Sequence, residues 1–311
     1  MLASSGSHQP DMKSKRALIA TLYNEADNVS RWWDCLMRQT VMPDEIVLVD
    51  GGSNDGTWEQ LQRLAKPCAV PIKLEQRRCN IAAGRNRAIH LTDAEIIASN
   101  DAGSFPEPDW FGEITRLLIA DERLDIVGGK SIVSVENEFQ KLMISFERPD
   151  RDPLPGAPFG SSRNIAYRRQ AWSDVGGYPE WLTLTSEDAL FNFQLHKIGK
   201  VFGYNPRAIV RWAGRENEAE YLKMLYSYGY GSGESRLYAR SYWVHFAVTV
   251  FPLLLLFSKR RLANLRFRYL RNALCIGGWF AGRLRGHTAP PGWRRVDGVY
   301  LSPEALRFLS K

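Results

Sequence analysis

Three short segments of this sequence combine carboxylates and glycines in a way that suits ligand binding. They are Tyr23-Asn24-Glu25, Asp50-Gly51-Gly52-Ser53 and Asn100-Asp101-Ala102-Gly103. A carboxylate held in a loop can accept a hydrogen bond from the N–H of a base or from a ribose hydroxyl. Glycine allows a ligand to approach the backbone closely. We therefore consider all three segments candidate parts of a binding site.

The longest glycine-rich loop, from Asp50 to Thr57, contains three glycines and two carboxylates. It has neither the G-x-G-x-x-G nor the G-x-x-x-x-G-K-[ST] pattern, so the sequence does not indicate a dinucleotide site or a P-loop. A tight turn followed by a capped helix is the alternative interpretation, because Thr57 and Gln60 have capping-box spacing.

Alternating strands and helices must position these segments. Apolar runs of strand length lie at residues 16–22, 45–50, 72–75 and 94–99, and helical patterns lie at residues 28–38, 57–65 and 82–90. This β-α-β order is typical of a buried, mostly parallel sheet flanked by helices. Ligands of such sheets bind beyond the carboxyl ends of the strands, where the three polar segments occur.

Positive charge is concentrated near the C-terminus. The chain of 311 residues has 41 Lys and Arg against 34 Asp and Glu, a formal net charge of +7. Residues 235–296 hold 12 of the basic residues and no acid, and subtracting them leaves −5 for the other 249 residues. A basic surface attracts nucleic acid, anionic membranes or anionic substrates. Because the rest of the chain is mildly acidic, we predict no nucleic-acid partner.

Two apolar stretches lie within this basic region. Residues 242–257 and 273–281 are largely apolar, but both are shorter than the roughly 20 residues needed to cross a bilayer. Buried core helices are one interpretation. The flanking Lys259-Arg260-Arg261 and the arginines of residues 266–271 have no balancing acid. They favour an interfacial region that is drawn to anionic lipid.

The cysteines and the N-terminus indicate the compartment. The four cysteines (Cys35, Cys68, Cys79 and Cys275) show neither C-x-x-C pairing nor zinc spacing, which is typical of a reducing cytosol. Residues 1–15 are polar and Ser-rich, without the apolar run of a signal peptide, so we expect a flexible lead-in.

Several further motifs occur in a fixed order along the chain. They are Ile19-Ala20-Thr21-Leu22-Tyr23-Asn24-Glu25, the loop of residues 46–57, Ala83-Gly84-Arg85-Asn86, Asn100-Asp101-Ala102-Gly103 with Pro106-Glu107-Pro108-Asp109-Trp110, Arg163-Asn164-Ile165-Ala166-Tyr167-Arg168-Arg169, Val175-Gly176-Gly177-Tyr178-Pro179-Glu180 and Ser186-Glu187-Asp188. Together they resemble the family 2 glycosyltransferases, over about residues 16–215. The resemblance implies the GT-A fold, a Rossmann-like α/β arrangement. It also implies inverting transfer of a sugar from a nucleotide diphosphate donor to an acceptor hydroxyl.

The resemblance also assigns roles to individual residues. The donor nucleotide is expected to contact the segment from Thr21 through Tyr23 to Glu25, the turn at Asp50 and Gly52, and the strand end at Asn100 and Asp101. Arg85 is expected near the diphosphate. Contacts with the acceptor or the diphosphate are expected from Arg163, Arg211, Trp212 and Arg215.

The pair Glu187-Asp188 is expected to be catalytic, with Asp188 as the general base. An inverting displacement needs one carboxylate facing the acceptor hydroxyl and positive charge near the departing diphosphate. Thr185 and Asp188 also have capping-box spacing. The two interpretations are compatible, because the start of a helix can hold a base.

One position departs from the family pattern. The family usually has Asp-x-Asp, whose second Asp binds a divalent cation, whereas this sequence has Asp101-Ala102-Gly103. Mg²⁺ or Mn²⁺ can still bind through Asp101 and the donor phosphates, because Mg²⁺ often uses only one or two protein ligands. Alternatively, arginines supply the charge that stabilises the leaving group.

These observations predict a glycosyltransferase domain at residues 16–225 and a basic, helical C-terminal region at residues 226–311. This region is expected to be an appendage that binds the cytoplasmic face of the plasma membrane peripherally. The acceptor is expected to be a saccharide or a lipid-linked saccharide of a cell-surface glycan. A catalytically inactive membrane scaffold is the alternative suggested by Gly103. A nucleotidyltransferase is not indicated, because no Lys-rich phosphate loop follows the first strand.

Overall fold

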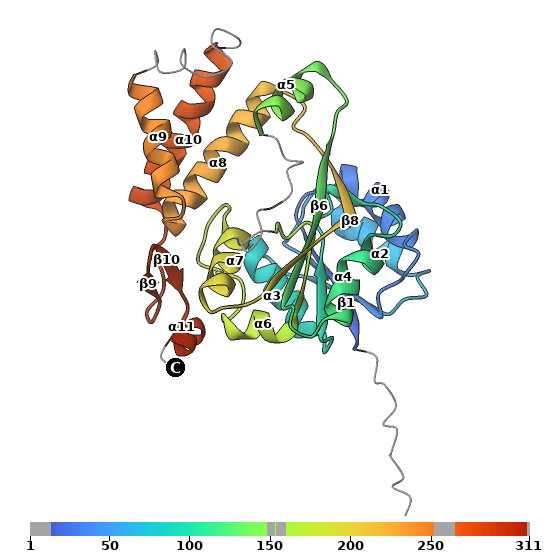
Figure 1. Ribbon diagram of the computed structural model, residues 1–311. Coiled ribbons are helices and arrows are strands. Elements are labelled where there is room, and N and C mark those ends of the chain that lie inside the picture. Colours follow the sequence, from blue (N-terminus) through green and yellow to red (C-terminus); the bar gives the residue numbers. More distant parts are fainter. Residues whose placement is uncertain (1–13, 148–152, 154–159, 252–264, 310–311) are drawn as a thin grey trace, which may run out of the picture.

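The computed structural model describes residues 14–147, 153, 160–251 and 265–309. Its largest element is an eight-stranded sheet in the order β3-β2-β1-β4-β7-β6-β8-β5 (Figure 1). The strands are β1 Arg16–Leu22, β2 Glu45–Asp50, β3 Ile72–Gln76, β4 Ile96–Ser99, β5 Ser104–Pro106, β6 Ile126–Ser134, β7 Ile165–Arg168 and β8 Phe202–Ala213. Strands β3, β2, β1 and β4 pair in parallel, so their carboxyl ends meet at one edge of the sheet.

Helices cover both faces of the sheet. On one face lie α1 Ala26–Met37, α2 Thr57–Ala65 and α4 Trp110–Ala120, and on the other lie α3 Ile81–Leu91, α6 Arg169–Asp174 and α7 Glu187–Lys197. Strand side chains alternate between the faces. Leu18 therefore packs under α1 and α4, and Ile19 packs under α3 and α7. Both are fully buried, which explains why the first strand is apolar throughout.

The first two strands and α2 begin and end at the predicted residues, but both predicted capping boxes are wrong. Gly56 precedes α2 with a φ of 96°, and Ser186 precedes α7 with a φ of 75°; neither makes a side-chain cap. The Thr57 hydroxyl instead bonds to the carboxylate of Asp55, and the Thr185 hydroxyl bonds to the carbonyl of Ser227. The Thr57 hydroxyl is thus used within its own loop and the Thr185 hydroxyl in a contact with α8, so neither is left to cap a helix.

A helical region stands beside the sheet (Figure 1). It contains α5 Glu138–Glu147, α8 Glu218–Ser235, α9 Ala239–Val250 and α10 Leu265–Arg285. Glycines bring α8 and α10 close together. A Cβ at Gly233 would lie 2.1 Å from the carbonyl oxygen of Trp279, and a Cβ at Gly282 would lie 2.0 Å from that of Tyr230. Because carbon cannot approach oxygen so closely, these glycines allow the two helices to pack backbone against backbone.

The last elements pack against the sheet domain. They are β9 Arg294–Val296, β10 Val299–Leu301 and α11 Pro303–Leu309. Val299, Leu301 and Ala305 lie in the same hydrophobic core as α7, and the Gln194 side chain accepts a hydrogen bond from the Ser302 backbone N–H. The end of the predicted C-terminal region is therefore integrated with the sheet domain.

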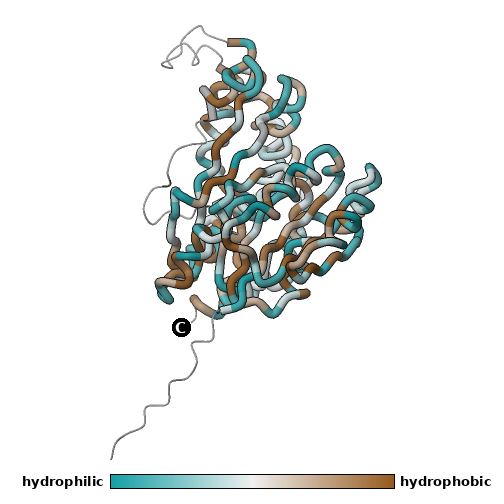
Figure 2. Tube along the Cα trace, turned by 90° about the vertical axis from the view of Figure 1, so that its right-hand side faces the viewer, coloured by the Kyte–Doolittle hydropathy of each residue, from teal (hydrophilic) through white to brown (hydrophobic). Residues whose placement is uncertain are grey.

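The apolar stretches have different environments. In residues 273–281, Cys275, Ile276 and Trp279 are buried in a core with α8. In the first stretch, Trp243 and Val244 of α9 are more than half exposed, and Figure 2 shows hydrophobic residues along the helical region as well as inside the sheet domain.

Residues 1–13, 252–257 and Lys259-Arg260-Arg261 lie outside the described residues. Among the described helices, none is long and apolar enough to cross a membrane.

Candidate functional site

The carboxyl end of β2 holds a buried carboxylate with an unused acceptor. The backbone N–H groups of Gly52 and Ser53 both donate to Asp50 Oδ1 at 2.7 Å. Asp50 is fully buried, yet its Oδ2 has no hydrogen-bond partner among the described residues. Buried polar atoms are nearly always paired. This oxygen is therefore suited to accept a hydrogen bond from a ligand.

The loops that follow β1 and β2 hold each other in place. The backbone N–H of Glu25 donates to the Thr57 hydroxyl at 2.8 Å, and that of Ala26 donates to Asp55 at 3.0 Å. Gly52 adopts a φ of 94°, which a side chain would disfavour. Tyr23 is 62% exposed, and its Cβ lies beside Gly51 in this loop pair. A turn held in place by these hydrogen bonds, with a projecting aromatic ring, is suited to stacking that ring against the face of a planar ligand.

Close packing of α3 against β1 brings Arg85 beneath the site. A Cβ at Gly84 would lie 2.3 Å from the Thr21 side chain, so only glycine fits there. Arg85 donates to Glu187 at 2.6 Å and to Asp101 at 2.9 Å. Burial alone would lower the pKa of Arg85, but the charges of Asp101 and Glu187 outweigh it and raise the pKa. The guanidinium is buried between two carboxylates, which it holds in position, and it also lines the larger cavity beside them.

The adjacent carboxylates at the start of α7 have different surroundings. Glu187 is buried against Arg85. Burial and the charge of Asp188 raise the pKa of Glu187, although Arg85 opposes them. Asp188 Oδ2 faces the Ser161 hydroxyl at 3.3 Å and lines an open cavity. Asp188 is thus placed to meet a substrate, and Glu187 is placed to hold Arg85.

Two cavities that share lining residues lie in this region, and one of them contains these carboxylates. One, of about 560 Å³, is lined by Glu187, Asp188 and residues of α8 and α9. The other, of about 490 Å³, is lined by Glu25, Gly103 and Trp212. Residues that line both are Asp101, Arg163, Arg215 and Tyr228. A ligand spanning the two cavities would pass two guanidinium groups and the Asp101 carboxylate.

The remaining predicted residues divide into three groups. Arg163 stacks over the Trp212 ring at 4.8 Å, so both belong to the site. Asn100 is fully buried and already bonded to the Trp32 indole and the Arg163 carbonyl, which makes it a positioning residue. Arg211 pairs with Glu107 at the rim of β8 and lines neither cavity. The structure therefore does not bring Arg211 together with the other predicted site residues.

The Glu25 carboxylate faces the space where the family's second Asp would stand, and Asp101 lines the same cavity. A Cβ at Gly103 would lie 3.9 Å from each carboxylate oxygen of Glu25. Burial raises the pKa of Glu25, and the nearby charges of Asp101 and Asp55 add to this effect. Oxygen ligands of this kind suit Mg²⁺ or Mn²⁺. In the described parts of the chain, no three acidic, His or Cys side chains cluster as a metal site, so a cation there would also need donor phosphates or water.

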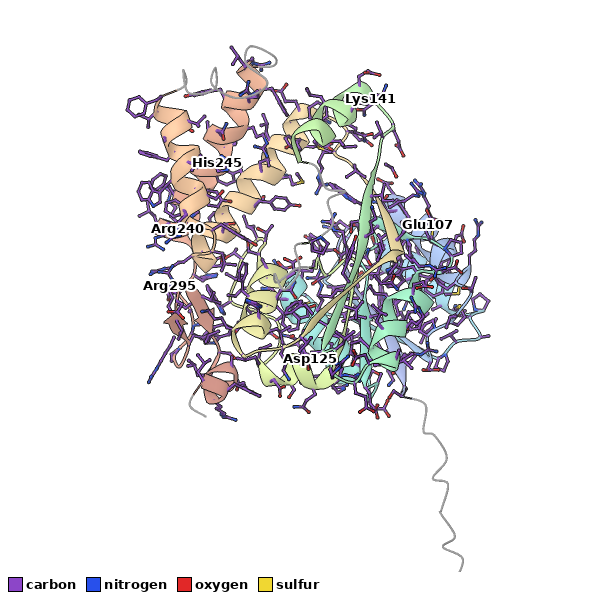
Figure 3. All side chains as sticks on the ribbon, viewed as in Figure 1. Glu107, Asp125, Lys141, Arg240, His245 and Arg295 are labelled. Atoms are coloured by element: carbon purple, nitrogen blue, oxygen red, sulfur yellow. The ribbon has the colours of Figure 1, made fainter. Side chains whose placement is uncertain are left out.

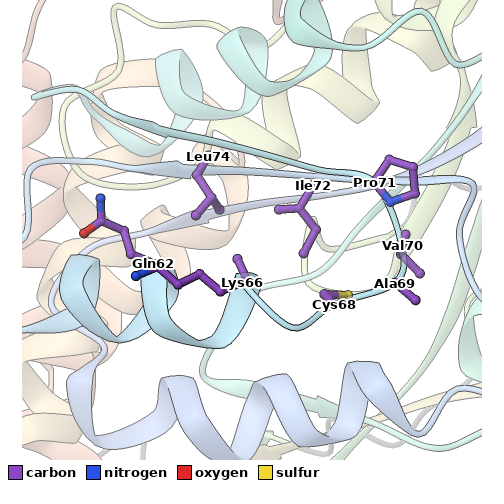
Figure 4. Close-up of a pocket in the computed structure, with 9 residues that line it drawn as sticks. Gln62, Lys66, Cys68, Ala69, Val70, Pro71, Ile72 and Leu74 are labelled. Carbon is purple, nitrogen blue, oxygen red and sulfur yellow. The ribbon is translucent and has the colours of Figure 1, made fainter.

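Another surface depression lies far from this chemistry. It is formed by the end of α2 and the edge strand β3, with Gln62, Lys66 and Ile72 in its lining (Figure 4). None of the predicted site residues lines it. We therefore assign the functional site to the two cavities beside Asp101.

The sequence interpretation did not include the residues that α8 and α9 contribute to the larger cavity. These are Tyr228, Ser232, Tyr238, Ser241, Tyr242 and His245. The spacing of Ser241, Tyr242 and His245, at positions i, i+1 and i+4, is the signal that places them on one face of α9, and Tyr238 directly precedes that helix. Their position opposite Asp188 depends on contacts between distant parts of the chain.

Known proteins resemble this chain in both sequence and structure. A family model described as glycosyl transferase family 2 matches residues 17–176. The O-antigen chain rhamnosyltransferase RfbN of Salmonella typhimurium is 24% identical over 238 residues, which cover 69% of this chain and 71% of that protein. The glycosyltransferase AglE of Haloferax volcanii is 26% identical over 176 residues, or 53% of this chain and 56% of AglE, so that match spans about half of each.

Solved structures share the fold. The mannosyltransferase PcManGT from Pyrobaculum calidifontis, in complex with GDP-Man and Mn²⁺, superposes with a TM-score of 0.62 at 18% identity over 88% of each chain. Residues 1–349 of S. aureus TarS, in complex with UDP, give a TM-score of 0.51 at 15% identity over 92% of this chain and 95% of that one. With the family match over half of its length, the chain belongs to glycosyl transferase family 2 and is a glycosyltransferase.

Proposed function

We propose that this glycosyltransferase inverts the anomeric carbon as it moves a sugar from a nucleotide diphosphate donor to an acceptor hydroxyl. The observation that carries the proposal is the exposure of Asp188 in a cavity that continues past Asp101 and two arginines. Asp188 takes the proton of the acceptor hydroxyl, whose oxygen forms a bond to the anomeric carbon. The bond from that carbon to the diphosphate oxygen breaks, and the nucleoside diphosphate leaves with the electron pair. An inactive scaffold is not favoured, because the Arg85, Glu187 and Asp188 arrangement is intact.

Positive charge for the departing diphosphate comes from Arg163 and Arg215, which line both cavities. Guanidinium groups bind phosphate oxygens through two parallel hydrogen bonds. Arg85 acts indirectly, by holding the Asp101 and Glu187 carboxylates. A divalent cation held by Asp101 and Glu25 would add charge stabilisation at the same diphosphate.

Donor binding is tested by thermal shift with UDP-, GDP- and dTDP-sugars. A donor that binds the folded state is expected to raise Tm. Asp50→Ala removes the unused Oδ2 and the acceptor of two backbone N–H groups. Because hydrogen bonds to a charged group contribute roughly 1.5–3 kcal/mol, donor affinity should fall about tenfold or more. Exposed Asp93→Asn is the control; wild-type affinity in Asp50→Ala would contradict the assigned role.

Cation binding is tested by titrating Mn²⁺ into the protein with its nucleoside diphosphate, followed by calorimetry. We expect Mn²⁺ to increase nucleotide affinity, and Glu25→Gln to weaken that increase, because a neutral amide is a poorer ligand for a hard cation. Glu59→Gln, exposed in the first turn of α2, is the matched control. Nucleotide affinity that is unchanged by Mn²⁺ or EDTA would exclude the cation role.

We propose a role in cell-surface polysaccharide synthesis, at the cytoplasmic face of the plasma membrane. The support is the acid-free basic region of residues 235–296, together with exposed Trp243 and Phe251 on α9 and at its end. In Figure 3, Arg240 and Arg295 lie on the side of this region away from the sheet. Aromatic and basic side chains on one surface favour binding to anionic lipid.

Membrane binding is tested by vesicle sedimentation rather than by truncation, because removing residues 235–311 would also remove Val299 and Leu301 from the core. Wild-type protein should sediment with vesicles that contain phosphatidylglycerol and much less with pure phosphatidylcholine. Arg240→Glu combined with Trp243→Ser should release it. Ile119→Ser, which changes an exposed apolar residue on α4, should not. Equal sedimentation of all variants would refute the proposal.

A further inference from the structure

One face of α9 forms the wall opposite Asp188. Tyr238 precedes the helix, and Ser241, Tyr242 and His245 follow at helical spacing; all four line the cavity that contains Asp188. The same helix turns Trp243 and Val244 toward solvent, 55% and 64% exposed. The cavity-lining residues are therefore different from Trp243 and Val244, although Tyr238 is itself 50% exposed at the cavity mouth. These four residues carry hydroxyl, aromatic and imidazole groups and include no Asp, Glu, Lys or Arg.

Tyr238 is held in a conformation that is unusual for a bulky residue. Its φ is 56°, in the left-handed region, and its ring packs edge-on against Phe193 of α7 at 5.6 Å. Burial raises the pKa of Tyr238 to about 12, and the negative charge of Asp188 contributes. The hydroxyl is thus a protonated donor near the base. Ser186, beside Glu187, is also left-handed, so backbone strain occurs on both sides of the cavity, as is common at functional sites.

Packing against α10 fixes the other two ring systems. Tyr242 stacks on Trp279 with a centroid distance of 5.8 Å. His245 Nδ1 pairs with the side-chain oxygen of Asn272, whose amide N–H donates to the Arg268 carbonyl at 2.7 Å. Since Nδ1 then carries the proton, Nε2 of the neutral imidazole is an acceptor. The glycine contacts between α8 and α10 keep this support rigid.

We propose that this face of α9 is the acceptor subsite and that it binds an uncharged pyranose ring. This inference rests on the proposed transfer reaction, because it places the acceptor hydroxyl beside Asp188. The C–H face of the sugar packs against Tyr238 or Tyr242, and its hydroxyls bond to Ser241 and to His245 Nε2. Pockets that combine aromatic side chains with a few fixed polar groups orient small ligands in this way. The rigid support lowers the entropic cost of binding.

The test measures binding without transfer, using octyl glycosides of glucose, galactose, mannose and N-acetylglucosamine in saturation-transfer NMR titrations. The wild-type protein should bind at least one probe saturably. His245→Ala and Tyr238→Ala should each weaken that binding about tenfold, a change equivalent to losing one or two hydrogen bonds with the packing around them. Val244→Ala, on the solvent face of the same helix, is the matched control and should bind as wild type does. Tyr238→Phe, which keeps the ring, separates loss of the hydroxyl from loss of folding.

The nucleotide-induced rise in Tm is followed in every variant, so that donor binding is scored separately. If His245→Ala and Tyr238→Ala weaken probe binding but leave the nucleotide-induced rise in Tm unchanged, the result supports the subsite. No saturable binding of any probe, or equal weakening in Val244→Ala, overturns it whether or not the nucleotide binds. Saturable probe binding by a protein that binds no nucleotide would support the subsite and contradict the donor proposal.

Discussion

Replacing Asp188 by Asn is expected to lower kcat by about 10²- to 10⁴-fold, the usual contribution of a general base. The amide cannot take the proton of the acceptor hydroxyl, so the nucleophile stays poor. The change in side-chain volume is small. In the wild-type protein the N–H of Ala189 donates to Asp188 Oδ1 at 2.7 Å, and the side-chain oxygen of Asn can accept the same hydrogen bond. Nucleotide affinity should be nearly unchanged. The measurement is steady-state transfer to an alkyl glycoside, combined with nucleotide titration.

Asp93→Asn is the matched control for Asp188→Asn, because Asp93 is 81% exposed at its side chain and lies far along the chain from α7. It should retain full turnover. If Asp188→Asn kept more than about a tenth of wild-type kcat, another group would have to be the base. A large loss of nucleotide affinity would instead indicate that Asp188 shapes the donor site.

The sequence was informative where local pattern and chemistry coincide. Buried parallel strands must be apolar on both faces, which is why β1 and β2 could be predicted to the residue. Polar residues at the carboxyl ends of such strands contribute little to the apolar core. Their presence therefore indicates a binding function for Asp50 and Asp101. The resemblance then supplied an order of motifs that local pattern alone does not provide.

Roles that depend on contacts between distant residues could not be predicted in this way. The pairing of Arg85 with Glu187 joins residues that are 102 positions apart in the sequence, so no local pattern could predict it. Glu25 faces Gly103 only because the first and fourth strand ends lie side by side. The α9 wall requires α10 to pack against both α8 and α9, and Phe193 of α7 to contact Tyr238, and no spacing within one helix encodes that packing.

Arg85→Met is the second large effect that we expect, and it acts on stability. Arg85 is 2% exposed and pairs with both Asp101 and Glu187. Removing one partner of a buried ion pair typically lowers the free energy of unfolding by about 3–5 kcal/mol, because the other charge is left unpaired in the low-dielectric interior of the protein. Urea unfolding should therefore show a loss of this size. Arg87→Met, on the same helix, breaks the solvent-accessible pair with Glu75 and should cost much less, because water screens that pair.

The pH dependence distinguishes an unpaired charge from a simple packing defect. Burial and Asp188 already raise the pKa of Glu187, and Arg85 opposes them, so removing Arg85 should raise it further. A carboxyl whose pKa is higher in the folded than in the unfolded state contributes stability below its unfolded pKa and loses it as the pH rises through its folded pKa. Arg85→Met should therefore regain stability relative to wild type as the pH falls through the raised folded-state pKa of Glu187 toward its unfolded value. Adding Glu187→Gln should remove most of that pH dependence, whereas a defect that is independent of pH would mean that lost packing, not the stranded carboxylate, destabilises the variant.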